Sequence, residues 1–197
     1  MLRSIRPLIL AIPLVLAGLP LASAQDFNDG VKAFGRGDYP AALKAWKPLA
    51  EKGDARAQHY LGLMYTQGLG VPKDHAKAVA WFKKAAEAGN VPAAYNLGFR
   101  YLRGQGVPQD IKTGAGWIRR AAKAGLAPAQ HMMGLLYANG DGVAQDFVQA
   151  YLWLSLSAKQ KNQIAEKDRK AIAKRMTADQ LRRAEALIAK WEPEPLR

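Results

Sequence analysis

Residues 54–89 read DARAQHYLGLMYTQGLGVPKDHAKAVAWFKKAAEAG. This stretch recurs twice more when the sequence is laid over itself at a shift of 36 residues. The matching positions are a mid-segment glycine, a tyrosine, a turn glycine and a tryptophan: Gly62, Gly98 and Gly134; Tyr65, Tyr101 and Tyr137; Gly68, Gly104 and Gly140; Trp81, Trp117 and Trp153. Self-similarity at such a period predicts a repeat array, in which each unit buries its apolar face against its neighbours.

Each unit is predicted to form two helices joined by a glycine turn. Apolar residues recur at helical spacing in both halves of the first unit, at Ala57, Leu61 and Tyr65 and again at Ala78, Phe82 and Ala86. Gly62 lies in the middle of the first helix, where glycine costs about 1 kcal/mol relative to alanine. We therefore expect a neighbouring helix to approach closely there, and we predict an all-α solenoid of antiparallel helix pairs.

The helix ends have local causes in the sequence. Asp74 precedes the second helix and can cap its free amides, and Gly89 suits a left-handed stop after it. In the third copy Lys161 replaces this closing glycine. On that basis we expect the second helix of the third copy to continue past this point.

The repeated residues resemble the Sel1-like repeat family, a branch of the tetratricopeptide-like helical solenoids. The pattern A-x-x-x-L-G-x-x-Y-x-x-G-x-G-V-x-x-D-x-x-x-A-x-x-W-x-x-x-A-A-x-x-G is complete from Ala57 to Gly89. The second copy departs from it at Gly114, and the third departs at Met133, Ser157 and Lys161. The resemblance implies a solenoid fold and a role as an adaptor between proteins in signalling or envelope assembly.

The chain is divided by these patterns into six segments. They are a signal peptide (1–24), a degenerate N-terminal tetratricopeptide-like unit (25–53), three Sel1-like repeats (54–89, 90–125 and 126–161) and a basic C-terminal helical cap (162–197). In the cap, Thr177 and Gln180 have the spacing of a capping box, which predicts that a helix begins there.

The N-terminus has the composition of a secretory leader. Arg3 and Arg6 precede an interrupted apolar run over residues 8–21, and Ala22-Ser23-Ala24 supplies the small residues of a cleavage site. The run is shorter than the roughly 20 residues that cross a bilayer. We therefore expect an exported bacterial protein, periplasmic or secreted, without stable membrane insertion. The chain has no cysteine, which removes disulfide and thiol chemistry.

The charge is strongly basic and concentrated near the C-terminus. The formal net charge of +13 becomes +11 without the two leader arginines, and residues 159–190 alone carry +6. A cap with a solvated basic face is the favoured interpretation, and the alternative is a docking face for an acidic partner, with Arg175, Arg182 and Arg183 as its candidates. We expect no nucleic-acid partner, because an exported protein meets little of it.

No catalytic, cofactor or metal site is predicted. The sequence lacks the G-x-S-x-G, H-E-x-x-H and phosphate-loop motifs, and its G-x-G-V segments follow helices, whereas dinucleotide loops follow strands. His59 and His131 occupy equivalent positions two units apart, too far for the roughly 2 Å bonds of a shared metal ion.

The first helices carry a second stripe of side chains that do not face the second helices. By resemblance to tetratricopeptide-like folds, this stripe and its flanking residues would line a concave groove. The candidates are His59, Tyr60, Leu63, Gln67, Tyr95, Asn96, Phe99, Arg103, His131, Met132, Leu135 and Asn139. Their mixture of apolar and hydrogen-bonding groups suits a peptide or helix of another protein. The alternative is that adjacent units or the C-terminal helices cover the stripe.

Three classes of function follow from the sequence. The leading one is a monomeric, non-enzymatic scaffold or regulator that binds an unidentified, acidic protein partner in the groove. The second is a basic binder of envelope polyanions or cell-wall material. The third, a secreted hydrolase, is disfavoured, because the cysteines of cysteine-rich relatives linked to β-lactam hydrolysis are missing and the mature chain has no S-x-x-K motif.

Overall fold

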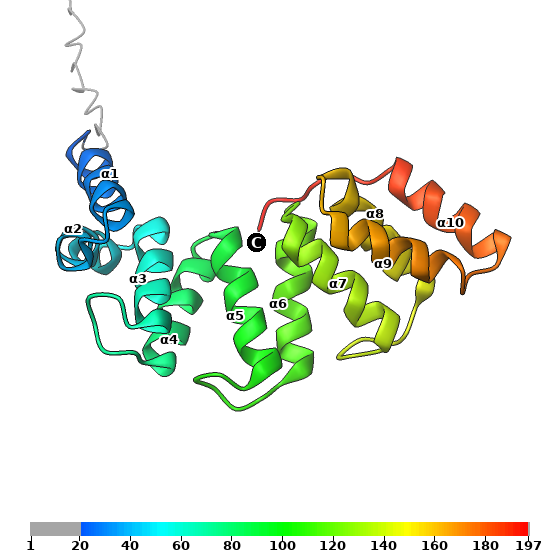
Figure 1. Ribbon diagram of the computed structural model, residues 1–197, viewed down its shortest axis with the longest axis horizontal. Helices are drawn as coiled ribbons and strands as arrows, with labels where there is room; N and C mark the ends of the chain where they lie inside the picture. The colour runs from blue at the N-terminus through cyan, green and yellow to red at the C-terminus, as the bar shows by residue number, and fades with distance from the viewer. Residues whose placement is uncertain (1–20, 197) are drawn as a thin grey trace, which may run out of the picture.

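The computed structural model describes residues 21–196, and for residues 21–25 the backbone alone. Residues 1–20 of the predicted signal peptide therefore lie outside the described part of the chain. The described residues form ten α-helices and no strand, and the helices follow one another along an arc (Figure 1). The predicted all-α solenoid is confirmed.

The helices come in consecutive pairs. An N-terminal pair is followed by three pairs whose helices all have 13 residues, which we call repeats 1, 2 and 3, and then by two C-terminal helices. In chain order they are α1 (Leu21–Gly35) and α2 (Tyr39–Glu51); α3 (Ala55–Gln67) and α4 (His75–Glu87); α5 (Val91–Arg103) and α6 (Ile111–Lys123); α7 (Ala127–Asn139) and α8 (Phe147–Lys159); α9 (Gln163–Ala173) and α10 (Ala178–Ala189).

Each helix packs against the helices before and after it as far as α9, and α10 packs against α8. The apolar stripes of both helices supply a core in three clusters, in which Trp46 (N-terminal), Phe82 and Ile118 (central) and Leu154 (C-terminal) are buried. The caps form as predicted, because the side chain of Asp74 accepts from the amide of Lys77 at 2.9 Å. The capping box of α10 is also present.

The mid-helix glycines lie where two helices meet most closely. A Cβ atom added at Gly62 would lie 2.5 Å from the ring of Phe82. In repeat 2 both helices have glycine at the crossing, and a Cβ atom on Gly98 would lie 2.9 Å from the carbonyl oxygen of Gly114. The expected close approach is confirmed, and in repeat 2 it brings backbone against backbone.

The second glycine of each G-x-G-V turn has a role that the sequence did not indicate. Its turn rests on the start of the second helix of the preceding unit, so that the turn of one repeat touches its neighbour. The pairs in contact are Gly70 with Tyr39, Gly106 with His75 and Gly142 with Ile111. The glycine turns therefore join successive units as well as the two helices within one unit.

The third repeat ends differently from the sequence expectation. Helix α8 stops at Lys159, the position equivalent to the ends of α4 and α6, and does not continue. Lys161 adopts the left-handed conformation that glycine was expected to supply, with φ of 66°, and is the one non-glycine described residue with positive φ. The expectation was wrong because Asn162 caps α9 through the amide of Ala165, and this next helix fixes the turn.

Replacing Lys161 with glycine is expected to stabilise the fold by about 1 kcal/mol, since the left-handed region costs an L-residue about that amount. Urea unfolding of the parent and the variant measures this difference. Lys159→Gly in the last turn of α8 serves as the control and should destabilise, because glycine weakens a helix. Equal stability of parent and Lys161→Gly would mean that this turn is unstrained.

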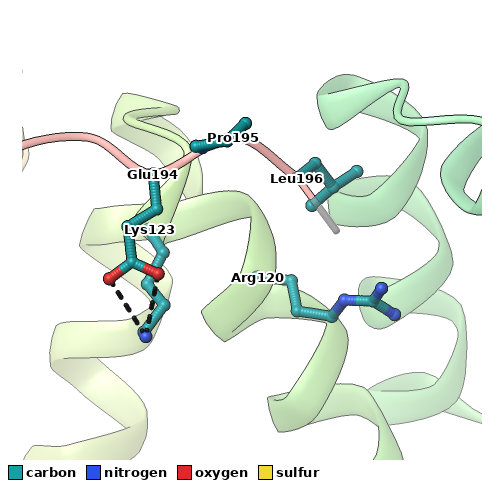
Figure 2. Close-up of a pocket in the computed structure, with 5 residues that line it drawn as sticks. All are labelled: Arg120, Lys123, Glu194, Pro195 and Leu196. Carbon is teal, nitrogen blue, oxygen red and sulfur yellow. Dashed lines mark hydrogen bonds and ion pairs between the residues drawn. The ribbon is translucent and has the colours of Figure 1, made fainter.

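After α10 the chain runs back toward repeat 2 as an extended tail (Figure 1). The amide of Glu194 donates to the carbonyl of Lys123 at 2.8 Å, and the Glu194 carboxylate pairs with the Lys123 ammonium at 3.2 Å. Figure 2 shows this pair at the end of α6, with Pro195 and Leu196 continuing beyond it. The tail thereby ties the C-terminal helices to a repeat that is not their neighbour in sequence.

Candidate functional site

The predicted groove residues lie on one face of α3, α5 and α7, which we call the first-helix face. Nine of them are half-buried: His59, Tyr60, Leu63, Tyr95, Asn96, Phe99, His131, Met132 and Leu135. Three at the carboxyl ends of the helices are exposed: Gln67, Arg103 and Asn139. The face thus combines packed side chains along its length with exposed polar groups at one edge.

Hydrogen bonds connect the first helices of successive units at a regular spacing. Asn96 Nδ2 donates to His59 Nε2 at 3.0 Å, and His131 Nε2 lies 2.7 Å from Asp168 Oδ2. Both pairs are 37 residues apart, so Asp168 on α9 takes the place that Asn96 has on α5. Helix α9 therefore continues the first-helix face and contacts it at His131.

Tyr60 lies in an aromatic cluster with the N-terminal pair of helices. Its ring stacks on Trp46 with 4.3 Å between centroids, and Phe27 and Phe34 meet it edge-on. The ring of Tyr60 is accordingly packed against the N-terminal core cluster, which makes it a structural residue at this end of the first-helix face.

A cavity of about 420 Å³ opens on the first-helix face between repeats 2 and 3. Three predicted residues line it, Phe99, Arg103 and Met132, together with Leu102 of α5. Its other lining residues were not predicted from the sequence; they are Gln109, Ile111, Leu136 and Asp141. Two of these come from the turns and one from the start of α6, outside the first-helix stripe.

The corresponding space between repeats 1 and 2 is occupied by a buried arginine. Arg100 is 8% exposed and donates to Thr66 Oγ1 and Gln105 Oε1, both at 2.8 Å, and to His75 Nδ1 at 3.2 Å. The sequence did contain a signal for this network. Arg100 stands in a core position that the other repeats fill with Met64 and Leu136.

Burial shifts the protonation of two groups on the face. It lowers the pKa of His59 to about 4, because the charged imidazolium loses its hydration, and it raises the pKa of the Tyr95 phenol. His59 is therefore neutral near pH 7, which leaves Nε2 free to accept from Asn96. Protonation of His59 would put a hydrogen on Nε2, so this nitrogen and the Asn96 Nδ2 amide would both be donors and the bond would be lost.

This shift predicts an acid-sensitive contribution to stability. The unfolded chain takes up a proton at His59 near pH 6.5 and the folded chain only near pH 4, so stability present above pH 6.5 is lost as the pH falls toward 4. The loss is on the order of 3 kcal/mol. We expect the difference in unfolding free energy between the parent and His59→Gln to change by this amount between pH 6.5 and pH 4, and a constant difference would contradict the shift.

The basic C-terminal residues are spread over the surface. Arg175 lies over the ring of Phe147 at 4.4 Å, and Arg182 pairs with Asp179 at 2.9 Å. Arg183 is exposed on α10. Two of the three candidates for a basic docking face are thus engaged within the protein.

The described residues offer neither a metal centre nor a membrane-spanning helix. No group of three or more histidine, aspartate or glutamate residues among them could hold a metal ion. None of the described helices is both long enough and apolar enough to span a bilayer.

Comparison with known proteins identifies the repeats. The family model for the Sel1 repeat matches residues 55–90, 91–126 and 127–162, which is more than half of the chain. The chain belongs to the Sel1 repeat family. Sel1 repeat proteins generally act as scaffolds for interactions between proteins.

Two solved structures share this Sel1 repeat architecture. A Sel1 repeat protein from Oxalobacter formigenes is 29% identical with a TM-score of 0.70, over 73% of this chain and 59% of that one. The protein c5321, a protective antigen of uropathogenic Escherichia coli with an SLR fold, is 31% identical with a TM-score of 0.61, over 86% of this chain and 45% of that one. This chain therefore spans about half the length of these structures. A search of curated proteins gave no match.

Proposed function

We propose that this protein is an exported, non-catalytic scaffold or regulator that binds a segment of a partner protein across its first-helix face. The cavity between repeats 2 and 3 carries this proposal, because it gives the face a concave point of attachment lined by both apolar and polar side chains. Aromatic and arginine side chains dominate the binding energy of protein interfaces, and Phe99 and Arg103 place both types at its edge.

Export rests on the leader-like residues 1–24 and has a direct test. N-terminal sequencing of the protein recovered from the periplasm or medium of an expressing bacterium should begin at Gln25. A mature chain that keeps residues 8–21, or one found in the membrane fraction alone, would refute the export proposal.

The binding face is tested by site-specific photo-crosslinking. A crosslinking amino acid at Gln67 reports on the exposed edge of the first-helix face, and the same group at Lys83 on α4 is the control for the second-helix side. We expect one defined crosslinked partner from Gln67 and none from Lys83. Equal crosslinking at both positions would indicate nonspecific contact and would refute the proposed face.

Affinity then separates the face from the basic end. Arg103→Ala should weaken partner binding by about 2 kcal/mol if this arginine is a hot spot. Arg182→Glu with Arg183→Glu should instead slow association and reduce its salt dependence. If the double reversal abolishes binding even at high salt while Arg103→Ala binds like the parent, the partner docks on α10 and the proposed face is wrong.

A further inference from the structure

The repeats offer a matched comparison at successive junctions, by which we mean the contacts between the first helices of neighbouring units. At the junction of repeats 1 and 2, four side chains fill the space with a hydrogen-bonded network: Thr66, His75, Arg100 and Gln105. The guanidinium of Arg100 reaches all three of the others and occupies the centre of this junction.

At the junction of repeats 2 and 3, the residues 36 positions further along are Leu102, Ile111, Leu136 and Asp141. All four line the cavity of about 420 Å³. Leucine at position 136 is shorter than arginine and offers no hydrogen bond, so an opening remains at this junction, with apolar side chains on one part of its wall and Arg103, Gln109 and Asp141 on the other. Ile111 is 41% exposed, so its side chain is accessible to a ligand.

The junction of repeat 3 with α9 is closed again by apolar packing. The equivalent residues there are Ala138, Phe147 and Ile172, which belong to one core cluster. Arg175 covers the ring of Phe147 at 4.4 Å. The central junction differs from its two neighbours in that Leu102, Ile111 and Leu136 line an opening.

The rim of the cavity carries an available cation. The Arg103 guanidinium lies 5.6 Å from the centre of the Phe99 ring and has no hydrogen bond or ion pair with any described residue. Asp141 is on the rim as well, but its carboxylate accepts from the Asn139 amide at 3.2 Å. A bound anion would therefore be favoured on the Arg103 side and repelled on the Asp141 side.

From this arrangement we infer that the central junction is an anchor pocket for a peptide segment with one large aliphatic side chain and a carboxylate beside it. The aliphatic group enters between Leu102, Ile111 and Leu136, and the carboxylate pairs with Arg103. The inference rests on the proposed function, and it specifies which side chains of the partner the face selects.

The test uses a defined probe, an acetylated and amidated hexapeptide Gly-Ser-Leu-Glu-Ser-Gly, with Leu→Ala and Glu→Gln counterparts. Methyl NMR of the full chain follows Ile111, Leu102 and Leu136 during titration. We expect saturable shifts with the parent peptide and at least about ten-fold weaker binding of each counterpart. Arg103→Ala should bind the parent peptide and the Glu→Gln peptide equally, because the partner of the carboxylate is gone.

A grafted variant fills the pocket with side chains that already coexist in this fold. Leu102→Thr, Ile111→His, Leu136→Arg and Asp141→Gln reproduce the network of the first junction. The graft should keep the helical content of the parent and lose peptide binding. The reciprocal control, Arg100→Leu with His75→Ile, Thr66→Leu and Gln67→Arg, should open a second pocket with its own arginine and add a second set of shifts.

The outcomes separate this inference from the proposed function. Peptide binding that the graft leaves unchanged, or the absence of saturable shifts at the three methyl-bearing residues, overturns the anchor pocket. Octanoate binding tighter than the peptide would also overturn it in favour of a small amphiphilic ligand. The proposed scaffold stands or falls separately, on the crosslink from Gln67 at the far end of the face.

Discussion

Replacing Gly98 with leucine is expected to lower the free energy of unfolding by about 3 kcal/mol or more, at the upper end of overpacking costs. The first added atom, Cβ, would lie 2.9 Å from both the Gly114 carbonyl oxygen and the Ile118 side chain. Ile118 is fully buried, and the carbonyl belongs to the backbone of α6, so neither can move aside without separating the helices. Because each unit is stabilised by its neighbours, the damage should extend to repeats 1 and 3.

Gly116 provides the matched control within the same repeat. It also lies in α6, but a Cβ atom added there meets nothing within 4 Å. Gly116→Ala should be neutral or stabilising by up to about 1 kcal/mol, the difference in helix propensity. Urea unfolding of the parent and both variants measures the contrast. A Gly98→Leu protein as stable as the parent would show that the α5–α6 crossing is looser than described.

The sequence predicted the parts of the fold that depend on position within one unit. The helix pairs, the aspartate caps and the close approach at Gly62 and Gly98 all follow from apolar spacing and residue type in a single repeat. Each of these is a local property, set by 3.6-residue periodicity or by a side chain within three residues.

Contacts between units were harder to predict from the sequence. The pairing of His131 with Asp168 joins residues 37 positions apart, and the network of Arg100 brings together side chains from three helices and a turn. Neither is visible in one repeat read alone. Comparing equivalent positions between copies would have shown that an arginine replaces Met64 and Leu136, and with it the difference between the filled and open junctions.

At Lys161 the prediction failed for a different reason, because the local rule that a glycine ends the second helix of each repeat does not hold there. The missing glycine predicted a longer helix, yet α8 ends where its counterparts do, because capping by Asn162 and packing of α9 outweigh about 1 kcal/mol of backbone strain. Tertiary contacts decide the conformation of a turn when the local preference is this small.

Replacing Gly106 with alanine is expected to destabilise the fold by about 2–5 kcal/mol, through two separable costs. The backbone has φ of 82°, which an L-residue adopts only with strain, and the added Cβ would collide with the His75 carbonyl and lie 2.8 Å from the Ala76 nitrogen. Both of these atoms belong to the backbone at the start of α4 and cannot move aside. The turn of repeat 2 would therefore have to move away and lose its contact with repeat 1.

Gly89→Ala isolates the first of these costs. Its φ of 87° is similar, and an added Cβ meets nothing within 4 Å, so this variant should lose only the roughly 1 kcal/mol of conformational strain. The difference between the two variants in chemical denaturation then measures the contact between units. Hydrogen exchange should locate the Gly106→Ala damage at the start of α4 and in the turn after α5. If Gly106→Ala costs no more than Gly89→Ala, the second glycine of the turn serves chain reversal alone, and the repeats are joined only through their helices.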